Sequence, residues 1–333
     1  MVQIIGGMYM RYIVTGVDGK VCRRVAEEML RQVDPHDLIF TCPDLEKLNT
    51  ANRERWTDLG VSLREANYDD PDQMKKAFRG GDRILIISGL DIKKRVQQHK
   101  NAIDAAMAAG VQHITYPGIG DDGLGEEVYE ENYVAPDHVA TDAYLKSCAK
   151  NYGLRYTTVR PNFYLENYTT MYTMLAFMHG NKYYSTTSDT KATLVPKDDV
   201  GRAYAAVLLG KGEDYKTYQI SGGEAVSVRE IIQIVSEESG IDIEFIPCSK
   251  EEHVKKLAEL NVPRFIEGDF SKSPVPFCAE DIITNDQFVE AGRCNIKSDV
   301  ELLTGKKPLS VREVVKQSAY VWEQNITSWK DMK

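Results

Sequence analysis

The sequence contains few of the residue patterns that hold metals or disulfides. Six cysteines occur in 333 residues, none in a CxxC pair and none beside a histidine at metal-ligand spacing. Six histidines occur as well, without an HExxH grouping. We therefore expect reduced thiols that fill small spaces, and no protein-bound metal.

The sequence also lacks long apolar runs and an excess of positive charge. No run of about 18 apolar residues occurs, and the apolar opening MVQIIGGMYM has no basic region before it. The formal net charge of -9 at pH 7 would repel phosphate backbones, and no basic stripe interleaved with aromatic residues offsets it. We therefore expect a cytoplasmic protein that binds neither nucleic acid nor a membrane.

The composition is that of an ordinary globular protein, with 42% hydrophobic and 27% charged residues. Short apolar runs alternate with segments of helical periodicity. This alternation predicts an α/β fold, a Rossmann doubly wound parallel sheet with helices on both faces. The expected strands are 11–16, 37–42, 83–89, 112–118 and 155–161, and the expected helices among them are 21–30, 98–110 and 140–153.

The alternation stops near residue 163, where an aromatic and methionine-rich segment begins. Two strand-like runs, 192–196 and 216–222, return to the sheet pattern around a helix at 198–210. The chain is long enough for a nucleotide domain with a smaller second lobe. We expect an N-terminal extension at 1–10, an NAD(P)-binding Rossmann domain at 11–162, and a C-terminal substrate lobe at 163–333 with excursions that rejoin the sheet at about 192–222.

The segment VTGVDGKVC joins the first strand to the first helix. Gly16 permits a tight turn and Gly19 a close approach, so that backbone N–H groups and the helix dipole can bind a pyrophosphate. Cys22 is small enough to let the helix pack on the strand. Asp18 would repel phosphate, although it could instead cap the helix. The alternative interpretation is a turn that needs its glycines for geometry alone.

Residues after the second strand of such folds decide between NAD and NADP. An acidic residue there binds the ribose hydroxyls, whereas an arginine binds the 2′-phosphate. The sequence TCPDLEKLNTANRER offers Asp44, one position late, and positive charge from Lys47, Arg53 and Arg55, which also fit a solvated helix face. The preference between the two cofactors therefore stays open.

Several blocks of the sequence carry a resemblance to a known family, among them VTGVDG, ILIISG, AAMAAGVQHITYPG and DHVATDAYLKSCAKNYGLRYTTVRPNFYLENY. Their order resembles the NmrA-like branch of the atypical short-chain dehydrogenase/reductases. It is particularly similar to the NAD(P)H:quinone reductase and triphenylmethane reductase subgroup. The resemblance covers residues 11–222 well and the remainder loosely. It implies an NAD(P)H-dependent oxidoreductase with NADP(H) or NAD(H) as its cofactor.

The resemblance also implies which residues bind the cofactor. The first loop would hold the pyrophosphate, the loop after the second strand the adenosine, and later loops the adenine, ribose and nicotinamide. The chain departs from the family by reading GVDG for the usual GATG and by lacking an arginine near Pro43. The implied cofactor residues are Gly16, Val17, Asp18, Gly19, Lys20, Val21, Cys42, Pro43, Asp44, Lys47, Asn67, Tyr68, Ser88, Gly89, Leu90, Tyr116, Pro117, Gly118, Pro161, Asn162 and Phe163.

The Tyr-x-x-x-Lys pair of typical short-chain dehydrogenases is replaced here by the block from His138 to Asp142. Without that pair a protein is badly equipped to oxidise alcohols, whereas quinones, conjugated carbonyls and benzylic ethers accept hydride with less help. His138 is a catalytic candidate that could protonate the product, or a helix-surface histidine bonded to Asp142. Tyr116 is the second candidate, because it could donate a hydrogen bond into the site or be a packed spacer.

Aromatic residues after the fifth strand are candidates for a substrate wall. A pocket of such rings would suit a flat aromatic acceptor, although a stripe of this kind is equally typical of a core. The candidate substrate residues are Phe163, Tyr164, Tyr168 and Tyr172.

These features favour a reductase that transfers hydride to a hydrophobic, aromatic acceptor. The alternative is a redox sensor, because NmrA-like folds include proteins that bind dinucleotide without turnover and act on a partner. An epimerase is disfavoured by the missing pair, since it must oxidise an alcohol. The expected partner is a small aromatic or hydrophobic substrate, and whether the chain forms a homodimer stays open.

Overall fold

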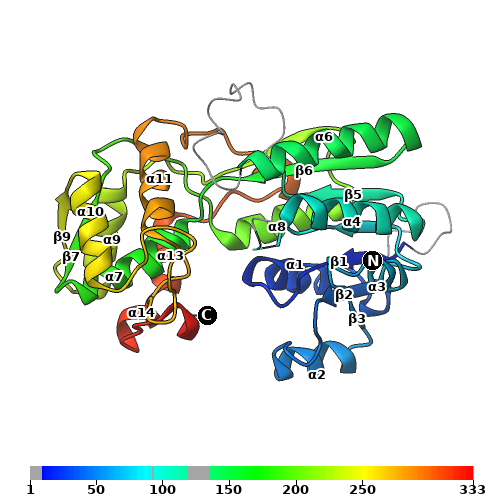
Figure 1. Cartoon of the computed structure of the whole chain (residues 1–333), viewed down its shortest axis with the longest axis horizontal. Helices are drawn as coiled ribbons and strands as arrows, with labels where there is room; N and C mark the ends of the chain where they lie inside the picture. The colour runs from blue at the N-terminus through cyan, green and yellow to red at the C-terminus, as the bar shows by residue number, and fades with distance from the viewer. Residues whose placement is uncertain (1–9, 90, 92–93, 119–134, 333) are drawn as a thin grey trace. The chain divides into compact units, whose positions relative to one another are not determined.

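The computed structural model describes residues 10–89, 91, 94–118 and 135–332 (Figure 1). The chain forms two compact units. The first takes in the residues up to 160 together with 200–218 and 302–305, and the second takes in 161–199, 219–301 and 306–333. None of the helices among the described residues is long and apolar enough to cross a bilayer.

A seven-stranded sheet in the order β3-β2-β1-β4-β5-β6-β8 organises the first unit. The pairs from β3 through to β6 are parallel, and Ile13 of β1 lies opposite Ile39 of β2 and Ile84 of β4. This order, with crossovers on both sides of β1, confirms the predicted doubly wound Rossmann fold. The strands are β1 (Tyr12–Val14), β2 (Leu38–Cys42), β3 (Ser62–Glu65), β4 (Arg83–Leu85), β5 (His113–Tyr116), β6 (Arg155–Pro161) and β8 (Thr217–Ile220).

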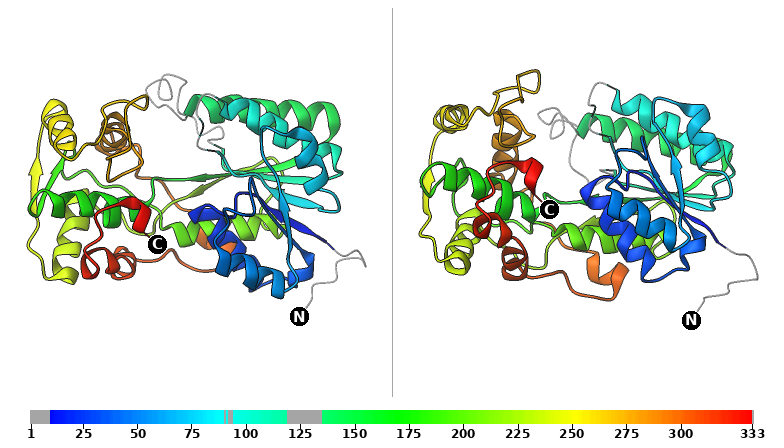
Figure 2. Two further views of the ribbon diagram at one scale, coloured as in Figure 1. Left: turned by 60° about the horizontal axis from the view of Figure 1, so that its bottom comes forward. Right: turned by 90° about the horizontal axis from the view of Figure 1, so that it is seen from below.

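Helices cover both faces of this sheet (Figure 2). Helices α3, α4 and α6 pack on one face around buried residues such as Phe78 and Ile103. Helices α1 and α8 lie on the other face, where Gly201 permits a close crossing, since a Cβ there would lie 2.9 Å from the Cβ of Arg24. The helices of this unit are α1 (Lys20–Leu30), α2 (Thr50–Asp58), α3 (Pro71–Ala77), α4 (Arg95–Ala108), α6 (Ala135–Tyr152) and α8 (Lys197–Leu208).

Several predicted boundaries in the first unit are wrong, among them the start of α6, which lies at Ala135 and not at residue 140. Strand β4 ends at Leu85 and not at residue 89, because the N–H of Ile87 donates to Oγ1 of Thr15 over 3.0 Å instead of continuing the strand ladder. Helix α4 begins at Arg95 and not at residue 98. The chain therefore leaves the sheet earlier after β4 than the apolar run alone indicates.

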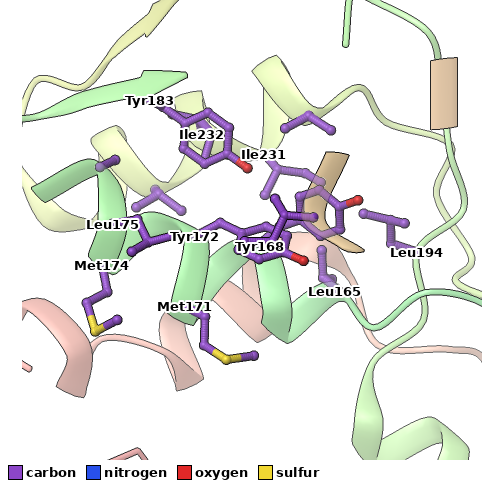
Figure 3. Packing of buried hydrophobic residues seen from close by; sticks show 14 of the residues in the cluster. Leu165, Tyr168, Met171, Tyr172, Met174, Leu175, Tyr183, Leu194, Ile231 and Ile232 are labelled. Atoms are coloured by element: carbon purple, nitrogen blue, oxygen red, sulfur yellow. The ribbon is translucent and has the colours of Figure 1, made fainter. Parts of the chain in front are cut away.

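The second unit has its own core, in which Tyr168, Tyr172 and Met174 pack with Ile231 and Ile232 (Figure 3). It also contains a parallel two-stranded sheet of β7 and β9, which lies at the edge of the unit in Figure 1. The elements are a π-helical turn (Asn167–Tyr172), α7 (Thr173–Met178), β7 (Lys182–Ser185), α9 (Val228–Ser239), β9 (Glu244–Pro247), α10 (Lys250–Glu259), α11 (Ala279–Glu290), α13 (Val311–Gln317) and α14 (Tyr320–Glu323). The residues of α12 (Val300–Thr304) are divided between the two units.

The sequence did not predict the small sheet, and it predicted a strand at 192–196 that the structure does not contain. In β7 and β9 the rings of Tyr183 and Phe245 stack with centroids 5.6 Å apart. Between 192 and 196 the chain forms isolated bridges, such as that of Val195 to Tyr164. Alternating apolar residues in this segment therefore contact several partners and not one neighbouring strand.

Gly222 gives a test of packing in the second unit. A Cβ on this residue would lie 2.2 Å from the carbonyl oxygen of Leu194, and a backbone atom cannot rotate aside. We expect Gly222→Ala to lower the free energy of unfolding in urea by about 1–3 kcal/mol. A Cβ on the adjacent Gly223 would meet Pro308 at an ordinary 3.5 Å, so Gly223→Ala should cost less than about 0.5 kcal/mol. Equal unfolding midpoints for the two variants would contradict this packing.

Candidate active site

The turn between β1 and α1 brings two glycines together. Gly16 has a φ of 63°, and a Cβ there would lie 2.5 Å from Cγ2 of Ile87. The N–H of Gly19 donates to the carbonyl of Gly16 over 2.9 Å, and that of Val17 donates to the carbonyl of Thr41 over 3.1 Å. The turn therefore lies against the chain at β2 and after β4, where the strand order reverses and doubly wound folds bind ligands.

Helix α1 begins directly after this turn and has no side-chain cap. Gly19 is the N-cap residue, Lys20 and Val21 open the helix, and no acidic residue lies in the first turn. The first N–H groups of a helix have no partner within the helix and bind anions readily. Asp18 is exposed and does not cap the helix, so this expected alternative is not realised. Cys22 is buried, and burial raises the pKa of its thiol.

The residues after β2 carry charges that neutralise each other. Nζ of Lys47 lies 3.1 Å from Oδ2 of Asp44, and this hydrogen bond is the main cause that lowers the pKa of the carboxyl group. Pro43 is exposed, whereas Cys42 is buried and burial raises its pKa to about 11. The segment therefore presents neither a free acid nor a free cation to a ribose.

The hydroxyl group of Tyr68 ties β1 to the chain after β4. It lies 2.7 Å from Oγ1 of Thr15 and donates to the carbonyl of Ile87 over 3.0 Å. Burial raises the pKa of this phenol, so it stays protonated. Asn67 is exposed, and its Oδ1 accepts the N–H of Asp69 over 2.9 Å. Tyr68 thus fixes the crevice beside the glycine turn with its hydroxyl group.

The loops after β4 and β5 hold the next group of candidates. Ser88 and Gly89 are half-buried, and Leu90 lies outside the described residues. Pro117 and Gly118 are buried after β5. A Cβ on Gly118 would lie 2.3 Å from Oδ1 of Asp142, so helix α6 approaches this loop closely enough to require glycine.

A buried hydrogen-bond network connects β4, β5, α4 and α6. The hydroxyl group of Tyr116 lies 2.9 Å from Nδ1 of His138 and 3.0 Å from Nδ1 of His99. Nδ1 of His99 also lies 2.9 Å from Oγ1 of Thr141, and its Nε2 lies 3.1 Å from Oγ of Ser88. His138 is 8% exposed and Tyr116 is fully buried, so neither the helix-surface alternative nor the simple spacer describes them.

The donors and acceptors of this network allow two arrangements of its protons. Thr141 donates its hydroxyl proton to the carbonyl of Asp137 over 2.8 Å, so a proton on Nδ1 of His99 would bond Oγ1 of Thr141. Ser88 donates its hydroxyl proton to the carbonyl of Gly89 over 3.3 Å, so a proton on Nε2 of His99 would bond Oγ of Ser88 instead. With the proton on Nδ1 of His99, the phenol of Tyr116 is free to donate to Nδ1 of His138, and the N–H of a neutral His138 then lies on Nε2.

Both imidazoles are neutral at physiological pH. Burial lowers the pKa of His99 to about 3 and that of His138 to about 4, with the positive charge of Arg95 as a further cause in both. The guanidinium of Arg95 lies 3.4 Å from the carboxylate of Asp137. No group of three or more His, Cys, Asp or Glu side chains in the described part of the chain is placed to hold a metal ion. The imidazoles therefore act through hydrogen bonds.

The sequence interpretation missed His99 and Thr141. His99 shares the buried face of α4 with Arg95, Ala102 and Ala106, at spacings of about one helical turn. Two polar residues on an otherwise apolar stripe are the signal that could have identified this position. Thr141 gave no comparable signal, because its role depends on α6 lying beside α4.

The candidates that follow β6 belong to the second unit. Nδ2 of Asn162 donates to the carbonyls of Thr193 and Cys294 over 2.8 and 2.9 Å, which is a structural role. Tyr168 is 1% exposed and Tyr172 is 5% exposed, with ring centroids 5.1 Å apart (Figure 3). The structure thus places these two expected substrate residues in a core, which is the alternative that the sequence left open. The other candidates, Pro161, Phe163 and Tyr164, are half-buried.

Comparison with known proteins gives consistent relatives. The model of the NmrA-like family matches residues 11–282. Quinone oxidoreductase 2 of Escherichia coli (strain K12) is 25% identical over 253 residues, which cover 75% of this chain and 82% of that protein. The structure of Citrobacter sp. triphenylmethane reductase matches with a TM-score of 0.77 at 26% identity over 93% of this chain and 99% of that chain. The same reductase complexed with NADP(H) matches with a TM-score of 0.76 at 25% identity over 93% of this chain and 100% of that chain.

The buried histidines predict that stability falls in mild acid. Burial lowers the pKa of His99 and of His113 to about 3 and that of His138 to about 4. The unfolded chain takes up these protons near pH 6.5, so the stability is present above about pH 6.5 and is lost as pH falls towards 4, by up to ~1.4 kcal/mol per histidine and pH unit. Urea unfolding at pH 7.5, 6.5 and 5.5 measures this slope. His113→Gln should make the slope shallower, and an identical slope in the variant would contradict the assignment.

Proposed function

Because this chain belongs to the NmrA-like family, we propose that it is an NAD(P)H-dependent reductase that delivers hydride to a hydrophobic, aromatic acceptor. The observation that carries this proposal is the buried network after β4 and at the end of β5, in which Nδ1 of His138 lies 2.9 Å from the hydroxyl of Tyr116. With its proton on Nε2, a neutral His138 would be the proton donor that a reductase of conjugated acceptors needs beside a hydride source.

The glycine turn is the part of the chain that fits a dinucleotide. Gly16 and Gly19 leave the start of α1 without side-chain bulk, and no side chain caps that helix end. A pyrophosphate there would accept hydrogen bonds from the N–H groups of the first turn. A nicotinamide bound towards the ends of β4 and β5 would supply the hydride. Asp44 and Lys47 form an ion pair with each other, so they favour neither NAD nor NADP strongly.

His138 would act on the acceptor as a proton donor. Hydride addition to a quinone or a conjugated carbonyl leaves negative charge on an oxygen atom, which a neutral imidazole N–H can stabilise and protonate. The network supports this role because the hydroxyl group of Tyr116 bonds Nδ1 of His138. Nε2, on the other side of the ring, then points away from that hydrogen bond. Among the residues that the structure describes, no lysine bonds Tyr116 in a way that could make the phenol a base. These features suit reduction better than alcohol oxidation.

The acceptor class rests on the relatives and on the half-buried aromatic residues. The relatives are named as a quinone oxidoreductase and a triphenylmethane reductase, both of which point to flat conjugated acceptors. Phe163 and Tyr164 stay half-buried in the second unit, and we propose them as contacts for such a ring. Tyr168 and Tyr172 would support them from the core.

One experiment in two steps tests the proposed function. Purified protein is titrated with NADPH and with NADH by fluorescence, and a panel of quinones and triphenylmethane dyes is then added while loss of the reduced cofactor is followed. We expect binding and oxidation with at least one aromatic acceptor. Tight binding without oxidation of cofactor by any acceptor would favour the dinucleotide sensor instead.

A charge placed on Gly19 tests the pyrophosphate site. We expect Gly19→Asp to weaken NADPH binding by about 100-fold, because like charges about 4 Å apart repel by roughly 1–4 kcal/mol near a protein surface. Gly19→Asn is the matched neutral control and should bind more tightly than Gly19→Asp. Aspartate and asparagine both cap helices well, so both variants should unfold no earlier than the wild type. Equal affinities of the two variants would place the phosphates elsewhere.

Removal of the proposed proton donor should separate turnover from cofactor binding. We expect His138→Ala to lower kcat with a quinone by about 100-fold, as is typical when a general acid is removed. The affinity for NADPH should change little, because the side chain lies in the network and not at the glycine turn. Val139→Ala, at an exposed neighbouring position of α6, is the control for changes in the helix. Full turnover in His138→Ala would return His138 to a purely structural role.

A further inference from the structure

Resting on the proposed function, we propose that His99 is a positioning residue that supplies protons to His138 through Tyr116, along a buried relay that starts at Ser88. The relay lies within the first unit and joins side chains from the loop after β4, from β5, α4 and α6. No step of the proposed hydride transfer requires His99 to touch the acceptor. Its effect passes through the phenol of Tyr116.

The distances along the relay are those of hydrogen bonds at each step. Oγ of Ser88 lies 3.1 Å from Nε2 of His99, Nδ1 of His99 lies 3.0 Å from the hydroxyl of Tyr116, and that hydroxyl lies 2.9 Å from Nδ1 of His138. Ser88 is half-buried, whereas His99 and Tyr116 are fully buried. Ser88 is therefore the member of the relay through which water can deliver a proton.

The relay uses one of the two tautomers that the contacts of His99 allow. Thr141 donates to the carbonyl of Asp137, which favours a proton on Nδ1 of His99, where it is shared between Oγ1 of Thr141 and the hydroxyl of Tyr116. Ser88 donates to the carbonyl of Gly89 over 3.3 Å, so in the relay its hydroxyl group turns from that carbonyl to Nε2 of His99. The donors then point from Ser88 towards His138, which is the direction needed to replace a proton lost from Nε2 of His138.

The proton transfers balance. As Nε2 of His138 gives its proton to the oxygen atom of the reduced acceptor, the proton of Tyr116 moves to Nδ1 of His138, and that of Nδ1 of His99 moves to the phenol oxygen. The hydroxyl proton of Ser88 moves to Nε2 of His99, and water restores the hydroxyl group of Ser88. After product release Nε2 of His138 takes a proton from water, and the same transfers run in reverse to Ser88. Each cycle therefore moves one proton from water to product.

The relay solves a specific problem of a neutral imidazole donor. If Nε2 of a neutral imidazole lost its proton with nothing supplied to Nδ1, an imidazolate anion would form inside a buried site at a high energetic cost. Simultaneous transfer from Tyr116 leaves His138 neutral throughout. His138 can thus act as an acid although its burial prevents it from carrying a positive charge.

The first test reads the tautomers directly and needs no turnover. Protein labelled with ¹⁵N in its histidines is studied by NMR, in which the two ring nitrogens of each tautomer have different shifts. We expect the proton of His99 on Nδ1 and that of His138 on Nε2. In Tyr116→Phe, which removes one hydroxyl with little change of volume, His138 should become a mixture of tautomers. A wild-type His138 with its proton on Nδ1 would overturn the relay.

The second test measures proton transfer during turnover. In mixtures of H₂O and D₂O, the rate of quinone reduction by the wild type should fall along a curve when it is plotted against the fraction of D₂O, as expected when several protons move in one step. Tyr116→Phe should show a straight dependence and a kcat lower by about tenfold or more. His99→Gln keeps a donor and an acceptor at this position, so its kcat should fall less than that of Tyr116→Phe.

Matched controls separate this inference from the proposed function. His113 is a buried histidine of β5 that lies outside the relay, where its Nε2 is 3.1 Å from Oγ1 of Thr157. The variant His113→Gln should therefore keep the curved isotope dependence and the tautomer of His138. If the protein reduces no acceptor, the proposed function fails while the NMR result still decides the relay. If it reduces quinones with a straight isotope dependence in the wild type, the relay fails while the reductase stands.

Discussion

One buried hydroxyl group, that of Tyr116 at the end of β5, constrains the active-site half of the first unit. It is fully buried, so it must find partners within the protein or cost about 1–3 kcal/mol as an unbonded group. The two imidazoles that satisfy it come from α4 and α6, which pack on the same face of the sheet. Gly118 lies in the loop after β5, where a Cβ would lie 2.3 Å from Oδ1 of Asp142 on α6. The two hydrogen bonds of one hydroxyl group thus connect two helices to the end of β5.

Much of this architecture could be predicted from the sequence because its causes are local. Apolar runs of strand length separated by periodic helices specify a parallel sheet, and a glycine between the first strand and helix specifies the turn. Gly16 indeed has a left-handed φ of 63° that other residues avoid. The turn between the first strand and the first helix could therefore be predicted from the sequence. The early end of β4 could not, since it depends on a hydrogen bond between Ile87 and Thr15, which are far apart in the chain.

The parts that sequence could not supply are those made by long-range packing. His138 had a catalytic and a helix-surface interpretation, and the structure buries it beside β5 through a contact over 22 positions. His99 is one of two polar residues, with Arg95, on the buried face of α4, and its partners come from distant parts of the chain. Tyr168 shows the opposite case, since aromatic character suggested a pocket while the fold of the second unit encloses the ring. In each case the side-chain chemistry was visible and its surroundings were not.

The partners of the Tyr116 hydroxyl differ from those in a typical short-chain dehydrogenase, because among the described residues they are two imidazoles and not a lysine. In typical short-chain dehydrogenases a lysine lowers the pKa of the catalytic tyrosine so that it can accept a proton from an alcohol. Here burial is the main cause that raises the pKa of Tyr116, and the guanidinium of Arg95 is paired with Asp137. The phenol and both imidazoles therefore stay neutral. In the proton arrangement that we propose, such a site gives a proton to a reduced acceptor far more easily than it removes one from an alcohol.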